Sequence, residues 1–176
     1  VLFPAGAVVG VGVAAVGLIA LGGPPVEIVL PLGLPDLPFQ IRLDALSAFF
    51  MVLLGLASAG VSVFAAGYFR AGEGASPGLL CLQYHLFLAS MLGVLLADDA
   101  YLFMVCWETM ALASFFLVTT QHRIAEIRAA GYLYLLVAHV GALAILLAFG
   151  VLHGEGDYSF GAMRAAQLTP FWSSVA

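Results

Sequence analysis

Lysine is absent from the sequence, and charged residues of either sign are few. Charged residues make up 9% of the 176 positions, and five Arg against ten Asp or Glu give a formal net charge of −5. Proteins that bind nucleic acid need a basic surface, and helices that lie on anionic membranes carry a basic face. The charge balance therefore argues against a nucleic-acid partner and against an amphipathic surface anchor.

Cysteine is also scarce, and the motifs of soluble enzymes are missing. Cys81 and Cys106 each lie in an apolar run, which is typical of small buried residues rather than of a disulfide or a metal pair. The sequence contains no glycine-rich phosphate loop, HExxH or CxxC. We therefore expect no metal site and no bound cofactor, and we do not expect the chain to be catalytic alone.

Hydrophobic residues, in contrast, dominate the chain. They make up 64% of the sequence, and the mean hydropathy is +1.13. A membrane-spanning helix needs about 20 apolar residues in a row. The sequence predicts an all-α membrane protein: a polytopic bundle of transmembrane helices in one domain, 1–176, with about five complete spans at 1–22, 44–69, 78–97, 100–121 and 129–152.

Residues 23–43 do not fit a helix, because this stretch contains five prolines. Residues 26–28 and 39–43 alternate apolar and polar side chains, as strands do, and the stretch from Pro31 to Pro38 supplies a turn. We expect a short β-hairpin over the membrane surface. An irregular extramembrane loop is the alternative.

The remaining connections are short. Asp44 is placed as the N-cap of the second span. Asp98 and Asp99 form a tight turn that makes the third and fourth spans antiparallel neighbours, and we expect both to be solvated. Residues 122–128 are expected to form a charged loop, and 153–176 a surface tail with one short helix and the start of another at Thr169-Pro170.

The arginines give an orientation. If the first span runs from inside to outside, three of them lie inside (Arg70, Arg123 and Arg128) and two outside (Arg42 and Arg164), in weak agreement with the positive-inside rule.

Glu108 is the only acid in the run 100–121, and it lies near the middle of that run. Inserting a carboxylate at that depth costs roughly 2.5–3.5 kcal/mol on insertion scales, and acids in spans usually mark ion paths. Hydrocarbon favours the protonated form, whereas a nearby cation favours the charged one. We interpret Glu108 as a proton site. A structural carboxyl that bonds a neighbouring helix is the alternative.

Two histidines are further candidates for a proton pathway. His139 lies close to the centre of the fifth span and could relay protons, or it could form a neutral hydrogen bond between helices. His85 lies nearer the start of the third span, where packing is the alternative. One His on each of two spans is also the minimum for a bis-His haem. Ser114, Thr119 and Thr120 could line a wet path, although bonds to their own helix are the default.

Three stretches together resemble a known family. CWETMALASFFLV at 106–118 resembles a motif of the antiporter-like proton-conducting membrane subunits, which occur in respiratory complex I, Mrp-type antiporters and energy-converting hydrogenases. Residues 43–69 resemble the D-x-L-S-x-F helix of these subunits. Residues 130–152, with A-H-x-G around His139, are most similar to the group of hydrogenase-4 component B and formate hydrogenlyase subunit 3.

The resemblance implies a function and a setting. Family members have about fourteen spans in two inverted repeats, so the chain would be an N-terminal part or a split subunit that lacks the first helix. It would be a proton-translocating multi-pass subunit in the cell (inner) membrane, beside other membrane subunits and redox subunits of a hydrogenase or complex I-like assembly. In the family the acid that matches Glu108 pairs with a lysine, which this chain lacks. The alternatives are an Mrp-type cation/proton antiporter subunit, a haem-carrying cytochrome subunit, and a scaffold that transports nothing.

Overall fold

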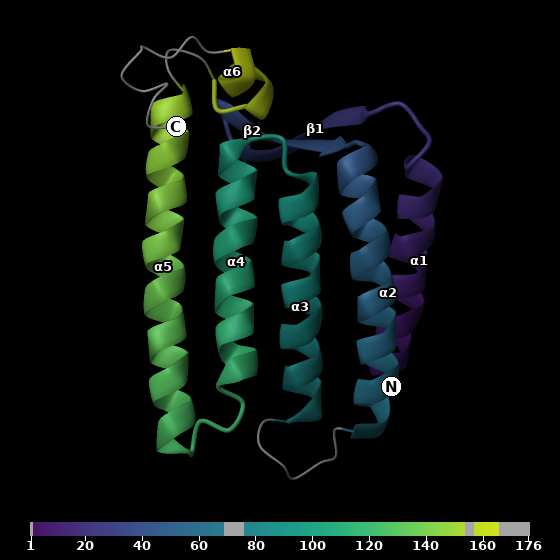
Figure 1. The fold of residues 1–176 in the computed structure, drawn as a ribbon, viewed down its shortest axis with the longest axis vertical. Coiled ribbons are helices and arrows are strands. Elements are labelled where there is room, and N and C mark those ends of the chain that lie inside the picture. The colour runs from purple at the N-terminus through teal and green to yellow at the C-terminus, as the bar shows by residue number, and fades with distance from the viewer. Residues whose placement is uncertain (1, 69–75, 154–156, 166–176) are drawn as a thin grey trace.

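The computed structural model describes residues 2–68, 76–153 and 157–165, in which five long helices stand side by side (Figure 1). The elements are α1 (Leu2–Ala20), β1 (Val26–Leu34), β2 (Leu37–Leu43), α2 (Ala45–Tyr68), α3 (Pro77–Leu96), α4 (Ala100–Val118), α5 (Ala125–His153) and α6 (Phe160–Ala165). The helices α1 to α5 are each long and apolar enough to cross a membrane. The predicted fold class, a helix bundle with a hairpin between the first two spans, is confirmed.

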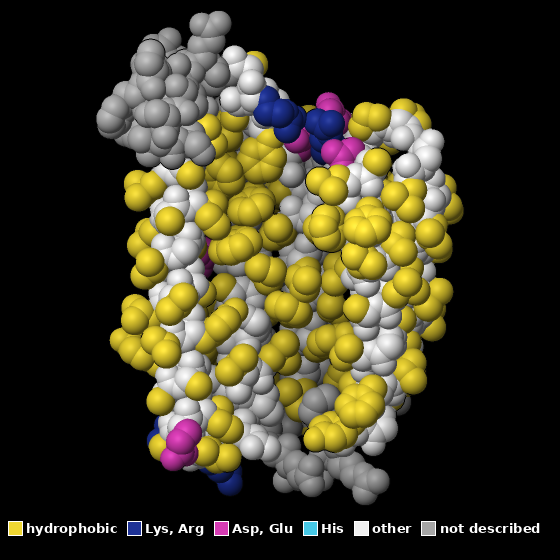
Figure 2. All heavy atoms as spheres, viewed as in Figure 1, with side chains coloured by type: hydrophobic (Ala, Val, Ile, Leu, Met, Phe, Trp, Pro, Cys, Tyr) yellow, Lys and Arg dark blue, Asp and Glu magenta, His cyan; other side chains and the backbone are white. Residues whose placement is uncertain are grey.

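The long helices form a row rather than a closed bundle. In Figure 1 α5, α4, α3 and α2 follow one another, α1 lies behind α2, and the hairpin and α6 cover the same end of the row. Nearly all charged side chains visible in Figure 2 gather at the two ends of the helices, and the flanks between them are hydrophobic. Such flanks suit lipid or further membrane helices, because both are as apolar as the exposed side chains.

Glycine allows the closest helix contact, between α1 and α2. A Cβ added to Gly55 would lie 2.5 Å from the backbone nitrogen of Ala14, and one added to Gly17 would lie 2.8 Å from the carbonyl oxygen of Ala48. Small residues let helix backbones approach closely in lipid, where van der Waals packing holds helices together. The glycine-rich composition of the first span therefore serves its packing against α2.

The hairpin pairs β1 with β2 in antiparallel register, from Val26 opposite Leu43 to Leu34 opposite Leu37. The register shifts between Val29 and Gly33, which is where Pro31 interrupts the ladder, since proline has no N–H to donate. Gly33 has a φ of +110°, which favours glycine. The hairpin prediction is confirmed, but its strands run through most of the stretch expected to turn.

The strand β2 docks onto the turn between α3 and α4. The backbone N–H of Asp98 donates to the carbonyl of Gln40 at 2.8 Å, and the N–H of Gln40 donates to Asp99 Oδ2 at 2.7 Å. The other carboxylate oxygen of Asp99 accepts the N–H of Leu102 at 2.7 Å and caps α4. Asp99 is only 4% exposed. The expectation that Asp98 and Asp99 are solvated is therefore wrong, because the hairpin covers them.

The loop after α4 is shorter than the sequence predicts, because α5 begins at Ala125 and not at residue 129. Arg128 lies in the first turns of α5, and its Nη1 donates to the carbonyl oxygens of His122 and Arg123 at 2.7 and 3.0 Å. The side chain thereby satisfies two loop carbonyls. Charged residues that suggested a loop instead form the start of the helix.

The end of the chain is described only in part. The expected short surface helix is present as α6, six residues at the hairpin end of the helices. The helix start expected at Thr169-Pro170 lies outside the described residues.

Replacing Gly55 by Val is expected to lower the free energy of unfolding by about 1–3 kcal/mol, because the added side chain forces α1 away from α2. Thermal unfolding of the purified protein in detergent, followed by circular dichroism, measures this. Gly60→Val is the matched control, since a Cβ at Gly60 meets nothing within 4 Å. Equal stability of the two variants would show that the α1–α2 contact is looser than described.

Candidate proton site between α4 and α5

Glu108 and His139 meet halfway along two neighbouring spans. Glu108 is the ninth of the 19 residues of α4, and His139 is the fifteenth of the 29 residues of α5. Their closest atoms, Glu108 Oε2 and His139 Nε2, are 3.5 Å apart, and the two side chains are 34% and 49% exposed. The structure thus brings together the two residues that the sequence ranked first, on two different helices.

The hydrogen bond at the second ring nitrogen of His139 fixes the tautomer of the ring. Nδ1 lies 2.9 Å from the carbonyl oxygen of Leu135, and a carbonyl can only accept, so Nδ1 carries a hydrogen. Nε2 then faces Glu108 either with a lone pair or with a second hydrogen. A favourable contact needs one proton between the two groups: on the carboxyl beside a neutral imidazole, or on the imidazole beside a carboxylate.

The distance leaves the contact adjustable. At 3.5 Å it lies within reach of an ion pair but is longer than the roughly 2.7–3.2 Å of a well-formed hydrogen bond. A small movement of α5 relative to α4 would therefore tighten or break it.

A second polar contact links the same two helices. The Ser114 hydroxyl donates to the carbonyl of Ala111 at 3.0 Å and also contacts the hydroxyl of Tyr134. Closer to the loop, Gly131 leaves no room for a Cβ against the methyl group of Thr119. These contacts hold α5 against α4 on the loop side of the pair. Sequence reasoning missed Tyr134, since nothing in an apolar run says which face meets the preceding helix.

His85 does not belong to this arrangement. Its Nδ1 lies 2.7 Å from the carbonyl oxygen of Cys81, and its ring centroid is 6.3 Å from that of Phe3 on α1. The ring packs so closely against Gly6 that a Cβ there would overlap it. His85 thus faces α1 and His139 faces α4, so the structure does not bring the two histidines to one position.

The other polar side chains of the spans are mostly satisfied locally. The hydroxyls of Thr119 and Thr120 donate to the carbonyls of Phe115 and Leu117 at 2.8 and 2.6 Å, as the default interpretation predicts. Within the described residues, both cysteines are free and no group of three His, Cys, Asp or Glu could hold a metal ion.

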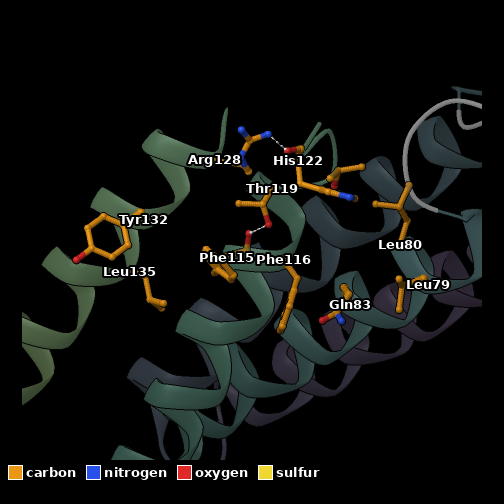
Figure 3. A pocket seen from close by; sticks show the side chains of 11 residues that line it. Leu79, Leu80, Gln83, Phe115, Phe116, Thr119, His122, Arg128, Tyr132 and Leu135 are labelled. Atoms are coloured by element: carbon orange, nitrogen blue, oxygen red, sulfur yellow. Dashed lines mark hydrogen bonds between the residues drawn. The ribbon is translucent and has the colours of Figure 1, made fainter. Parts of the chain in front are cut away.

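A cavity of about 530 Å³ opens between α3, α4 and α5 near the α4–α5 loop (Figure 3). Phe115 follows Glu108 by seven residues and Thr119 follows Phe115 by four, so both lie on the face of α4 that carries Glu108. Arg128 lies on the face of α5 that carries His139. The Oε1 atom of Gln83, one of the lining residues, is buried without a hydrogen-bond partner. The cavity is lined by Leu79, Leu80, Gln83, Phe115, Phe116, Thr119, Thr120, His122, Arg128, Tyr132 and Leu135.

The hairpin end of the molecule carries a cluster of ion pairs. Arg42 Nε lies 3.5 Å from Asp44 Oδ2, and Arg164 Nη2 lies 3.9 Å from Asp98 Oδ1. Burial raises the pKa of Asp98, whose side chain is 14% exposed, and the nearby Arg42 and Arg164 oppose this shift. The backbone N–H of Ser47 donates to Asp44 and lowers the pKa of that carboxyl, which confirms its position as the N-cap of α2.

Comparisons with known proteins identify the relatives of this chain. The chain is 34% identical over 163 residues to hydrogenase-4 component B of Escherichia coli K12, which is 92% of this chain and 23% of that protein. It is 30% identical over 118 residues to a Staphylococcus aureus MRSA252 protein provisionally named antiporter subunit mnhA2, which is 67% of this chain and 15% of that protein. Over the matched part, the chain belongs to the antiporter-like membrane subunit family.

The solved structures give the same fold. The antiporter-like chain aligns with the structure of the membrane-bound sulfane sulfur reductase, an archaeal respiratory membrane complex, with a TM-score of 0.69 at 24% identity, over 93% of this chain and 28% of that one. No family model matches the sequence. The family resemblance predicted from the sequence is confirmed, and with five apolar spans the chain is a multi-pass membrane protein. It spans about a quarter of the length of hydrogenase-4 component B.

Replacing Asp98 by Asn is expected to increase the free energy of unfolding at neutral pH. Burial raises the pKa of Asp98 in the folded protein, so folding favours the protonated carboxyl. The stability that this protonated form contributes is fully present below pH 3.8, the ordinary pKa of the group, and is lost as the pH rises through the pKa of the folded protein. The gain from the variant should therefore disappear in acid. Thermal unfolding in detergent from acid to neutral pH measures this.

Asp157→Asn should behave in the opposite sense, because hydrogen bonds from Ser159 lower the pKa of Asp157 and stabilise its charged form. If Asp98→Asn also loses stability at neutral pH, the contact with Arg164 outweighs the cost of burial.

Proposed function

We propose that this chain is part of a proton-translocating integral membrane subunit of a respiratory-type complex, and that Glu108 and His139 are its proton site. The observation that carries the proposal is the contact of 3.5 Å between a carboxyl and an imidazole at the centre of two spans. The likeness to hydrogenase-4 component B supports the hydrogenase or complex I-like setting.

The energetics of the membrane explain why such a pair suits proton transfer. A lone carboxylate at mid-membrane is costly, but a pair that shares one proton carries no net charge in either arrangement. The proton can therefore move between Glu108 and His139 without bringing a net charge into hydrocarbon. Uptake and release of that proton then require only a change in the electrostatic field at the pair.

The change in field must come from outside this chain. The chain has no lysine, and the four arginines among the described residues lie outside the central turns of the spans. A cation that approaches Glu108 on another helix stabilises the carboxylate and destabilises the imidazolium, which drives the proton away; its withdrawal allows reprotonation. Redox subunits outside the chain would drive that movement.

The partners follow from this incompleteness. Both side chains of the pair are partly exposed, and a neighbouring membrane helix or water has to cover them. We infer that the chain is one transmembrane unit of a longer or split antiporter-like subunit, in contact with other membrane subunits in the cell membrane. The coverage of 23% of hydrogenase-4 component B supports this inference.

A second candidate is a cation/proton antiporter subunit of Mrp type, which the similarity to mnhA2 favours. The two candidates differ in the transported ion. Sodium uptake into vesicles driven by an imposed pH gradient, with no electron donor present, would favour the antiporter. Proton translocation that requires electron transfer would favour the respiratory-type subunit.

Glu108→Gln is expected to reduce proton translocation by the assembled complex roughly a hundredfold, the scale of one lost proton-transfer group. Glutamine keeps the size and polarity of the side chain but cannot carry the proton. Proton release on electron transfer in inverted vesicles measures the effect. The control is Glu126→Gln, since Glu126 lies in the first turn of α5, away from the centre of the membrane. Normal translocation by an assembled Glu108→Gln complex would refute the proposal.

The double variant tests whether the two residues act as one unit. If Glu108 and His139 share one proton, then Glu108→Gln, His139→Gln and the double variant should have similar translocation rates, because the first substitution already removes the shared site. Residues that act independently would instead show losses that multiply in the double variant. The same vesicle assay, normalised to the amount of assembled complex, separates the two outcomes.

A further inference from the structure

The cavity between α3, α4 and α5 lies where a bilayer changes from headgroups to hydrocarbon. Leu79 and Gln83 are in the first two turns of α3, Phe116 is in the last turn of α4, and the α5 side of the cavity begins at Arg128. The cavity extends to Leu135, about 15 Å along α5 from its first residue. Its volume of about 530 Å³ is within the range of ligand-binding pockets.

The two ends of this cavity differ in polarity. His122, Arg128 and Thr119 lie at the loop end in Figure 3, and the wall leading away from the loop includes Phe116 and Leu135. A buried water needs two to four polar partners, and Phe116 and Leu135 offer none. The cavity therefore suits an amphipathic molecule, with its polar group at the loop and its apolar part between the helices.

The charge at the mouth selects an anion. Arg128 is held at the loop by its bonds to the carbonyls of His122 and Arg123, so its positive charge is fixed at the mouth (Figure 3). The loop and the first turn of α5 carry two arginines against the single acid Glu126. At the opposite end of the helices the described acids outnumber the arginines. The arginine distribution agrees weakly with a cytoplasmic loop side, and the cytoplasmic leaflet carries anionic lipids.

Gln83 adds a requirement for a hydrogen-bond donor. Its Oε1 atom is buried in the cavity region and has no partner among the described residues. A buried acceptor left without a donor is costly. That oxygen has almost no accessible surface, so the amide must rotate toward the cavity before a headgroup hydroxyl can donate to it.

We propose that this cavity binds an anionic phospholipid of the phosphatidylglycerol type. The phosphate lies at Arg128 and His122, a headgroup hydroxyl reaches the Gln83 amide once it has rotated toward the cavity, and an acyl chain lies against Leu79, Phe116 and Leu135. This site is separate from the Glu108–His139 pair and does not depend on the proton-transfer proposal.

The test measures lipid retention by the full subunit in its complex. The complex is purified from membranes in mild detergent, exchanged into nanodiscs with equal amounts of phosphatidylglycerol and phosphatidylcholine, and analysed for retained lipid by native mass spectrometry. We expect phosphatidylglycerol to be preferred at least about fivefold, the effect of one arginine near an anionic surface.

Two substitutions and one control locate the site. Arg128→Gln should abolish the preference for phosphatidylglycerol, while the glutamine amide can still donate to the loop carbonyls. Leu79→Trp should fill the cavity and displace both lipids. The control, Arg164→Gln, removes an exposed arginine at the opposite end and should leave the preference unchanged. Equal retention of both lipids, or a preference that survives Arg128→Gln, overturns the proposal. An assembled complex that retains no lipid also overturns it, and implies that a helix or water fills the cavity.

Discussion

The contact between a carboxyl and an imidazole in the middle of the membrane is the constraint on which the rest of the structure depends. Glu108 alone would be an expensive acid in hydrocarbon. Glu108 lies 3.5 Å from His139, whose Nδ1 is committed to the carbonyl of Leu135, and under the proposed function the pair would share one proton and carry no net charge. Under the proposed function, the same contact would let a nearby charge decide which of the two groups holds the proton.

The surrounding elements hold the two helices that carry this pair. Asp99 caps α4 and is anchored to the hairpin through Gln40, so the start of α4 is fixed at the membrane surface. At the other end Gly131 lets α5 approach Thr119, and Ser114 contacts Tyr134. The hairpin, which carries neither Glu108 nor His139, therefore contributes by positioning α4.

Much of the architecture could be predicted from the sequence, because span length and proline content act locally. The apolar runs gave the spans, and five prolines with alternating residues gave the hairpin. Burial of Asp99 could not be predicted, since it depends on a strand some 59 positions earlier in the chain. Nor could the sequence tell that His139, and not His85, faces Glu108, because that choice depends on which helix each face meets.

The shared proton is tested most directly by infrared difference spectroscopy of the full complex during an acid–base titration, with histidine labelled by ¹⁵N. The Glu108→Gln variant assigns the carboxyl band of Glu108, and the label assigns the imidazole bands. The account predicts that the Glu108 and His139 signals change together, and that His139→Phe shifts the titration of the Glu108 band. A Glu108 band that titrates identically in the native and His139→Phe proteins would contradict it.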